Sequence, residues 1–303
     1  MPVTDAHCHF FSARFFETLA RQRDGSLGDD PVGGVTGALG WEPPGPPEAL
    51  ADRWCAELDQ HGVARAALMA SVPGDEESVA AAVARHPARF VGFFMFDPTT
   101  PDASDRARRA FSEQGLRCVC LFPAMHHYRL DGEAALRLFE IAASFDHVAV
   151  FVHCGVLSVG VRKKLGLPSP FDVRLGNPLD LQTAAARHPD LPIIIPHFGA
   201  GFLHEALMTA DLCPSIHFDT SSSNGWIKYH PGLTLADVFT HTLAVVGPDR
   251  LLFGTDSSFF PRGWQRAVHD AQRTILTDLG LDPQSVDKVF QGNFARLFPT
   301  RQG

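Results

Sequence analysis

The chain begins with an apolar stretch, "VTDAHCHFF" (Val3–Phe11), that carries two histidines one residue apart. In an extended strand successive side chains alternate faces, so His7 and His9 point to one side while Cys8 points to the other. On a helix the same spacing would place the two imidazoles roughly 200° apart. Two imidazoles on one face can share a metal ion, so the stretch predicts a first strand that carries a pair of metal ligands at its end.

Seven further short apolar runs follow at near-regular intervals and predict seven more strands. They cover residues 64–70, 89–96, 117–123, 148–155, 192–199, 215–221 and 250–256. Amphipathic segments with helical periodicity separate the strands, as in residues 47–62, 76–87 and 177–190. This alternation predicts a single α/β domain over residues 1–303, folded as a (β/α)8 TIM barrel. An open doubly wound sheet is the competing fold, but it would normally carry a glycine-rich phosphate turn after its first strand, and none is present there.

Two long segments interrupt the alternation and would lie on the same rim of the barrel. Residues 25–47 are rich in glycine and proline and follow the first strand, and residues 156–176 follow the fifth. Loops of this length in a compact domain are often functional lids. We expect long rim loops at both positions, and the sequence leaves open whether they close over a substrate.

Composition and charge favour a cytoplasmic protein that acts on small molecules. The net charge is −8 with only four lysines, which argues against nucleic acid or an anionic membrane as a partner. Six cysteines without regular spacing predict reduced thiols in the cytoplasm. The N-terminus shows no secretion signal, and no apolar run reaches the roughly 18 residues that span a bilayer. We therefore expect a small-molecule substrate as the partner.

Five polar side chains fall at the C-terminal ends of predicted strands, namely His7, His9, His153, His197 and Asp256. Barrel active sites are built at this end of the strands, so the five side chains would meet at one mouth. Neutral imidazoles suit zinc and related ions, and three nitrogens with a carboxylate and an open position can activate water. A lone strand-end histidine is more often structural, but four of them and an aspartate at matching ends favour a metal site.

Four segments resemble signature segments of the amidohydrolase superfamily: "DAHCHF" (5–10), "FVHCG" (151–155), "IIPHFG" (194–199) and "LLFGTD" (251–256). The similarity is to its amidohydrolase-related (amidohydrolase 2) branch, which also holds aminocarboxymuconate-semialdehyde decarboxylase and γ-resorcylate decarboxylase. It extends over nearly the whole chain and includes residues 84–98, 185–201 and 289–298. Each motif is weak alone, but their order and spacing make the resemblance specific.

The resemblance implies that His7, His9, His153 and Asp256 bind the metal and that His197 stands beside it as a catalytic or water-orienting group. Related binuclear hydrolases bridge two ions with a modified lysine on the fourth strand, and "CVCLFP" has no lysine there. We therefore expect one divalent ion, with zinc first and manganese or iron as alternatives. Such an ion lowers the pKa of bound water to about 7, and Asp256 or His197 would accept the proton and pass it to a leaving group. Relatives often form dimers, so we expect a homodimer.

The sequence indicates the substrate-binding residues less clearly than the metal ligands. A substrate carboxylate would be held by an arginine near the mouth, for which the candidates are Arg162, Arg174 and Arg262, with Arg53 and Arg129 behind them. The aromatic residues on the loops expected to shape the pocket are Trp41, Phe171, Phe259, Phe260 and Trp264. They favour a planar or apolar substrate, with Trp41 a candidate contact. Surface solvation of the arginines and ordinary packing of the aromatics are the alternatives.

Three other residues lie next to the predicted site. Cys8 and Cys154 flank predicted metal ligands, but strand alternation points them away from the mouth, so we expect them to pack between barrel and helices. Asp219 ends the seventh strand and would orient His197 or a metal ligand, or cap a loop.

The whole pattern favours a metal-dependent hydrolase, in which activated water attacks the carbonyl of an ester, lactone or amide in a small molecule. The alternative is a metal-dependent nonoxidative decarboxylase of a small carboxylic acid, which would include aromatic acids, with His197 or Asp256 protonating carbon. Both reactions use the same ligands, so residue types do not separate them. A barrel that binds a ligand without turnover is a third class, against which the full ligand set with His197 argues.

Overall fold

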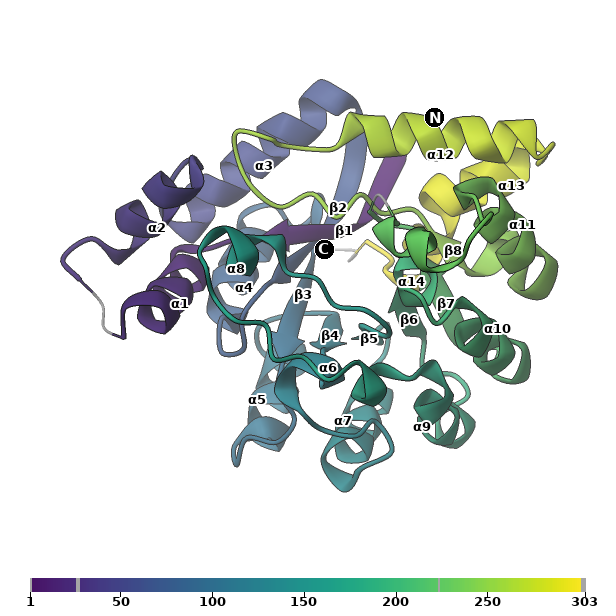
Figure 1. Ribbon diagram of the computed structural model, residues 1–303, viewed down its shortest axis with the longest axis horizontal. Helices are drawn as coiled ribbons and strands as arrows, with labels where there is room; N and C mark the ends of the chain where they lie inside the picture. Colours follow the sequence, from purple (N-terminus) through teal and green to yellow (C-terminus); the bar gives the residue numbers. More distant parts are fainter. Residues whose placement is uncertain (1, 26–27, 223, 301–303) are drawn as a thin grey trace.

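Eight parallel strands follow one another around a common axis in the order in which they occur along the chain (Figure 1). The computed structural model describes residues 2–25, 28–222 and 224–300. Its strands are β1 (Val3–Phe10), β2 (Val63–Ala70), β3 (Phe90–Phe96), β4 (Cys118–Leu121), β5 (Ala149–Val152), β6 (Ile193–Pro196), β7 (Ile216–Asp219) and β8 (Leu251–Leu252). Each strand pairs in parallel with the next. The fold is the predicted TIM barrel.

The ring closes between the segment that follows β8 and the first strand. Residues 253–257 run alongside β1 and bond to its backbone. The Ala6 N–H donates to the Phe253 carbonyl over 2.8 Å, and the Asp256 N–H donates to the His7 carbonyl over 2.9 Å. This closure places Asp256 directly beside the histidines of β1.

Helices cover the outside of the strands and extend over one rim (Figure 1). They are α1 (Ala13–Asp24), α2 (Pro31–Leu39), α3 (Pro47–His61), α4 (Glu76–Arg85), α5 (Ala103–Ser112), α6 (Pro123–His126), α7 (Glu133–Ala143), α8 (Gly160–Lys164), α9 (Gln182–Arg187), α10 (Leu203–Leu212), α11 (Leu235–Val246), α12 (Arg266–Asp278), α13 (Pro283–Asp287) and α14 (Asn293–Leu297). The predicted helices at 47–62 and 76–87 are confirmed, while 177–190 holds a 3₁₀ turn (178–181) before α9. Within the described residues no helix is long and apolar enough to cross a bilayer.

Alternate residues of the strands pack on opposite sides, as the strand period requires. Phe93, Cys120 and Phe151 belong to the cluster that fills the barrel interior. Phe94 and Val150 belong to the larger cluster between the strands and the helices. Both layers are apolar, so the polar side chains that could take part in a reaction lie at the strand ends, where the barrel interior meets the rim.

The cysteines follow the same division. Cys8 and Cys154 are fully buried in the layer between strands and helices, as predicted. Cys118 and Cys120 fill the barrel interior on β4. No two of the six cysteines are joined in a disulfide, and their reduced state in the cell stays a prediction.

The first rim insertion is not the irregular loop that the sequence predicts, because α2 forms inside it. The glycines of "PVGGVTGAL" are poor helix formers, so the helix propensity of these residues does not predict a helix. Its ends are well specified all the same: the Asp30 side chain accepts from the Gly33 N–H over 2.8 Å, Pro31 opens the first turn, and Gly40 ends the helix at φ 67°. Residues 26–27 of this insertion lie outside the described residues.

The two rim insertions contact each other. The second one contains α8, and Val161 of α8 packs in one apolar cluster with Phe15, Phe16 and Val35 of α1 and α2. The Arg162 guanidinium of α8 also donates to the Gln22 side chain of α1 over 2.5 Å. The rim loops predicted on one side of the barrel therefore form a joint structure above the strand ends.

Candidate active site

A cavity of about 380 Å³ opens at the C-terminal ends of the strands. Its lining includes all five strand-end residues singled out in the sequence: His7, His9, His153, His197 and Asp256. His153 directly follows β5 and His197 directly follows β6, while Asp256 is delivered by the segment that closes the ring. The upper wall comes from both rim insertions.

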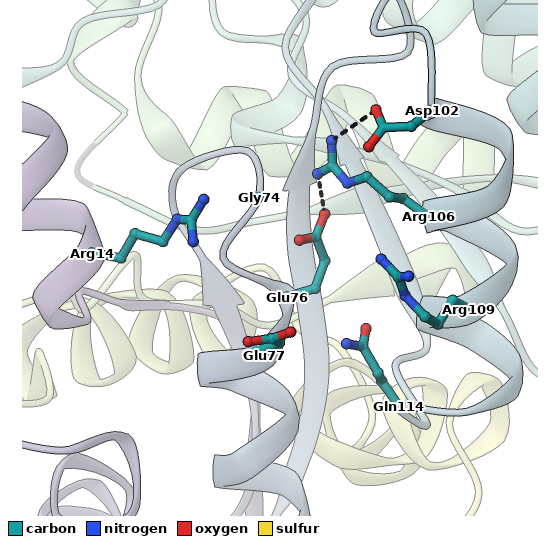
Figure 2. A pocket seen from close by; sticks show the side chains of 8 residues that line it. All are labelled: Arg14, Gly74, Glu76, Glu77, Asp102, Arg106, Arg109 and Gln114. Atoms are coloured by element: carbon teal, nitrogen blue, oxygen red, sulfur yellow. Dashed lines mark hydrogen bonds and ion pairs between the residues drawn. The ribbon is translucent and has the colours of Figure 1, made fainter.

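A second hollow, of about 260 Å³, lies outside the barrel between α1, α4 and α5 (Figure 2). Arg106 extends across it and pairs with Glu76 at 2.5 Å and with Asp102 at 3.7 Å. Its lining is polar and contains no histidine among the described residues. The clustered metal-ligand types therefore single out the cavity at the strand ends as the candidate active site.

Three side chains of this cavity form a potential metal site. One ligand atom from each of His7, His9 and Asp256 lies within 4.8 Å of the others. The Asp256 Oδ1 is 3.1 Å from His9 Nε2 and 3.8 Å from His7 Nε2. His7 Nε2 is buried and has no hydrogen-bond partner in the described part of the chain. A buried lone pair without a partner beside a second imidazole and a carboxylate fits a divalent ion.

Both histidines of this group are oriented by a hydrogen bond of Nδ1, the ring nitrogen that does not face Asp256. The His7 Nδ1 lies 2.5 Å from the Asp219 Oδ2, and a carboxylate only accepts, so Nδ1 carries the proton. The His9 Nδ1 lies 2.7 Å from the Ser71 hydroxyl, which itself donates to the Met69 carbonyl over 2.9 Å. Each ring therefore presents the Nε2 lone pair to the cavity, as metal ligation requires.

His197 is oriented in the same way by Ser221, which lies two residues after the end of β7. Its Nδ1 lies 3.1 Å from the Ser221 carbonyl and 2.9 Å from the Ser221 hydroxyl. A carbonyl only accepts, so His197 donates from Nδ1 and keeps the lone pair on Nε2. The same hydroxyl lies 3.0 Å from His7 Nδ1 and donates to Asp219, so Ser221 links the catalytic candidate to the metal-ligand candidate.

The charges of the site favour a cation between the first strand and Asp256. Burial lowers the pKa of His7, but the adjacent Asp219 carboxylate outweighs burial and raises it to about 9. Burial disfavours the ionised form of Asp256, but the adjacent imidazoles of His9 and His7 outweigh it and hold its pKa well below the ordinary value. Burial lowers the pKa values of His9, His153 and His197. A divalent ion would take the place of the His7 proton next to a carboxylate that stays ionised.

The two catalytic candidates share an unusual backbone conformation. His197 has φ 54° and Asp256 has φ 60°, both in the left-handed region that residues other than glycine rarely adopt. Such strain persists only where the surrounding structure enforces it, and it concentrates at functional sites. No local sequence pattern announces it.

The family model of the amidohydrolases matches residues 4–300. The chain belongs to the amidohydrolase family. None of the curated proteins matches this amidohydrolase.

Solved structures share the fold of this amidohydrolase over almost the entire chain. One is a 5-carboxyvanillate decarboxylase from Novosphingobium aromaticivorans complexed with manganese and 4-hydroxy-3-methoxy-5-nitrobenzoic acid, at 17% identity and TM-score 0.66, covering 98% of this chain and 96% of that one. Another is a probable 2-pyrone-4,6-dicarboxylic acid hydrolase from Acinetobacter baumannii, at 14% identity and TM-score 0.62, covering 98% and 99%. A third is an amidohydrolase from Burkholderia multivorans with bound zinc, at 15% identity and TM-score 0.63, covering 99% and 100%. At these identities the likeness shows the fold.

The candidate substrate residues of the amidohydrolase divide into two groups. Trp41 and Arg262 line the cavity, as does Phe259. Arg162 and Arg174 do not. Arg162 donates to the Pro168 carbonyl within its own loop, and Arg174, with 86% of its side chain exposed, pairs with a neighbouring aspartate. Loop sequence places an arginine on the rim, but the direction of its side chain depends on the path of the loop.

The remaining arginine and aromatic candidates are used elsewhere. Arg53 pairs with Glu42, and Arg129 pairs with an aspartate two residues on. Trp264 is buried and donates from its indole to Asp5 over 2.7 Å. The cavity lining excludes Phe171 and Phe260 as well. Phe260 and Trp264 belong instead to the core cluster between the strands and the helices.

Three functional candidates of the amidohydrolase escape a reading of the sequence. Ser71 and Ser221 hold the rings of the histidines, and Lys164 lines the cavity from α8. The two serines do carry a signal, because Ser71 directly follows the predicted strand 64–70 and Ser221 is the last residue of 215–221. The strand-end rule that singles out the histidines applies to them equally.

Proposed function

We propose that this amidohydrolase is a metal-dependent hydrolase that cleaves an ester, lactone or amide bond in a small molecule. The observation that carries the proposal is the orientation of His197. Its Nδ1 faces the Ser221 carbonyl over 3.1 Å, so its Nε2 holds the lone pair of a general base beside the group formed by His7, His9 and Asp256. A probable hydrolase among the solved structures of the same fold supports the assignment.

His7, His9 and Asp256 would hold one divalent ion, and we assign His153 as the fourth ligand. The His153 ring lies 5.3 Å from that of His197, and its Nδ1 is buried with no hydrogen-bond partner among the described residues. Zinc is the ion we expect, and the solved structures that hold zinc or manganese make manganese the first alternative. When bound, the ion supplies Lewis-acid activation of water and of the carbonyl.

The side chains of the chain then have separate roles. His197 accepts the proton of the attacking water at Nε2 and returns it to the leaving group, which avoids releasing a charged alkoxide or amide anion. Asp256 keeps one oxygen toward His9, so its other oxygen is a second proton acceptor. Trp41 and Arg262 contact the part of the substrate away from the reacting bond. Asp219, Ser71 and Ser221 hold the rings in place without touching substrate.

Nonoxidative decarboxylation of a small carboxylic acid is the second candidate. The cavity favours it through its aromatic lining, which includes Phe11, Trp41, Phe122 and Phe259 and suits a planar acid. A 5-carboxyvanillate decarboxylase shares the fold. In this reaction protonated His197 would give its Nε2 proton to the carbon as carbon dioxide leaves.

Metal content per chain tests both candidates, and it can be measured by elemental analysis of the native protein, His7→Ala and Asp256→Ala. We expect about one ion in the native protein and a loss in both variants. His204→Ala, which removes an exposed histidine of α10, is the control and should keep the metal. Two ions per chain would show that the lack of a lysine on β4 does not limit the site to one. No metal after reconstitution would overturn both reactions.

The products separate the two reactions. Esters, lactones, amides and aromatic acids are offered to the metal-loaded protein in ¹⁸O-labelled water. Incorporation of one labelled oxygen into a carboxylate product is the result expected for the hydrolase. Release of carbon dioxide without label in the organic product would assign the decarboxylase instead.

A further inference from the structure

Two basic side chains at the mouth of the cavity lack an acidic partner. Lys164 comes from α8 in the second rim insertion, and Arg262 comes from the segment after Asp256. The Arg262 guanidinium donates to the Ser258 hydroxyl over 2.6 Å and to the Asp256 carbonyl over 3.2 Å, both of which are uncharged. Neither cation pairs with a carboxylate of the described residues. The mouth therefore carries two positive charges that form no ion pair with an acidic side chain of the described residues, although the Asp256 carboxylate lies near enough to attract Arg262.

The positive charge of Lys164 and Arg262 is opposite in sign to the net charge of the protein. The chain as a whole has a net charge of −8, and Asp256 is the one carboxylate among the described residues that line the cavity. Asp256 is turned to the histidines, 3.1 Å from His9. A local positive field inside an acidic protein attracts anions to that point and not to the surface at large.

Both cations are held against a pair of stacked aromatic rings. Trp41 and Phe259 stack with their ring centroids 3.9 Å apart and their planes 10° from parallel. The Lys164 ammonium lies 5.6 Å from the Trp41 ring and 5.9 Å from the Phe259 ring, and the Arg262 guanidinium lies 4.5 Å from Phe259. Cation–π attraction keeps both charges at the mouth. Three separate segments of the rim are needed to build this arrangement.

We propose that the substrate carries an anionic group away from its reacting bond, and that Lys164, together with Arg262, binds that group at the mouth. The inference rests on the proposed function, which puts the reacting group at His197 and Asp256. The cavity volume of about 380 Å³ is near the lower end of small-molecule sites, about 300–1,000 Å³, which suits one ring. Lys164 is the specificity residue, because α8 brings its charge to the site independently of the catalytic segment.

Equilibrium binding to the metal-containing protein tests the inference without turnover. Isothermal titration calorimetry compares isophthalate with its monomethyl ester, which differs by one negative charge, and with benzoate. We expect the native protein to prefer isophthalate over the ester by about fivefold. Lys164→Met should abolish that preference and leave benzoate binding unchanged, while Lys164→Arg should retain it. The preference should also shrink when sodium chloride is raised to about 0.5 M.

Lys163→Met is the matched control. It removes the same charge from the adjacent exposed residue of α8, which does not line the cavity. Equal effects of the two lysine variants, or no preference in the native protein, would overturn the inference. If metal and benzoate binding persist in that case, the proposed function still stands. A metal-free protein with a Lys164-dependent preference would overturn the proposed function and leave the inference standing.

Discussion

Asp219 decides which nitrogen His7 presents to the cavity, and this can be tested at a single atom. In Asp219→Asn the amide NH₂ can occupy the place of Oδ2, 2.5 Å from His7 Nδ1, so that a donor faces a donor. His7 would then move its proton to Nε2 and lose the lone pair that binds metal. We expect metal affinity to fall by about 10- to 100-fold, as measured by competition with a chelator.

The control for this prediction is Asp172→Asn, which removes a carboxylate that pairs with Arg174 on the rim. Unchanged metal affinity in Asp219→Asn would mean that Asp219 only caps its loop, through the Ser221 N–H that it accepts over 2.7 Å.

His217 makes folding sensitive to acid. It is buried on β7 with its Nδ1 2.9 Å from the Ser215 carbonyl, and burial lowers its pKa to about 4, against about 6.5 in the unfolded chain. The unfolded chain binds the extra proton, so this stabilisation is complete above about pH 6.5 and is lost as the pH falls toward 4.

We therefore expect His217→Asn, which cannot take up a proton, to be less acid-sensitive than the native protein. Between pH 7 and pH 5 its free energy of unfolding should fall by about 2 kcal/mol less, as measured by urea denaturation at both pH values. His241→Asn, at an exposed site of α11, should behave as the native protein. An equal acid loss in native protein and His217→Asn would contradict the assignment.

For single residues, the sequence predicts which ones lie at the mouth of the barrel better than it predicts how their side chains are oriented. The strand-end rule finds the histidines and Asp256, because the strand period determines which side chains reach the mouth. The same rule predicts that Asp219 orients a metal ligand, and it lies against His7. It does not find the proton positions on the His9 and His197 rings, which depend on Ser71 and Ser221 from other strands. It also cannot separate Lys164 from Arg162, two residues apart on α8, since the loop path decides which one faces the cavity.

At the scale of elements, the ion pair between α4 and α5 stabilises the outer wall of the barrel. The Arg106 and Glu76 side chains are only 16% and 10% exposed and lie 2.5 Å apart (Figure 2). Arg106→Met keeps an unbranched aliphatic side chain but removes the guanidinium that pairs with Glu76 and lies 5.0 Å from the Phe96 ring centroid. We expect a loss of about 2 kcal/mol in the free energy of unfolding, measured by urea denaturation.

Arg109→Met serves as the control for this pair. Arg109 lies on the same helix and is exposed, and it has no ion pair with the described residues. The control should change stability by about 0.5 kcal/mol or less. A similar loss in both variants would show that the pair contributes nothing beyond general surface charge.

Strands are the elements that the sequence predicts best. A parallel sheet covered by helices is buried on both faces, so each of its strands is a short continuous apolar run in the sequence. The runs overestimate strand length near the rim: residues 250–256 predict seven residues where β8 has two, Leu251–Leu252. The rest of that run closes the ring through single backbone bonds and carries the strained Asp256. The helix α2 is missed for a different reason, since its caps outweigh its glycines.

At the scale of the whole molecule, the two ends of the chain are joined by a buried carboxylate. Asp5 of β1 accepts from the Thr255 hydroxyl over 2.5 Å and from the Trp264 indole over 2.7 Å. Thr255→Val removes one donor without a large change in shape. We expect a loss of about 2 kcal/mol in global stability, with a single unfolding transition in urea.

Thr240→Val, on the exposed surface of α11, is the control and should have little effect. A second transition in Thr255→Val would instead show that the end of the chain opens separately from the barrel. The expected homodimer stays a prediction, which light scattering on the purified protein can check.

Ring closure also sets when the metal site can exist during synthesis. Asp5 and Thr255 meet across 250 residues, and a ribosome adding about 5–20 residues per second needs roughly 12–50 seconds to make the chain between them. During that time the nascent strand offers His7 and His9 but no carboxylate to complete the site. We therefore expect the ion to enter only after Asp256 has been made, so a translation product truncated before Asp256 would carry none.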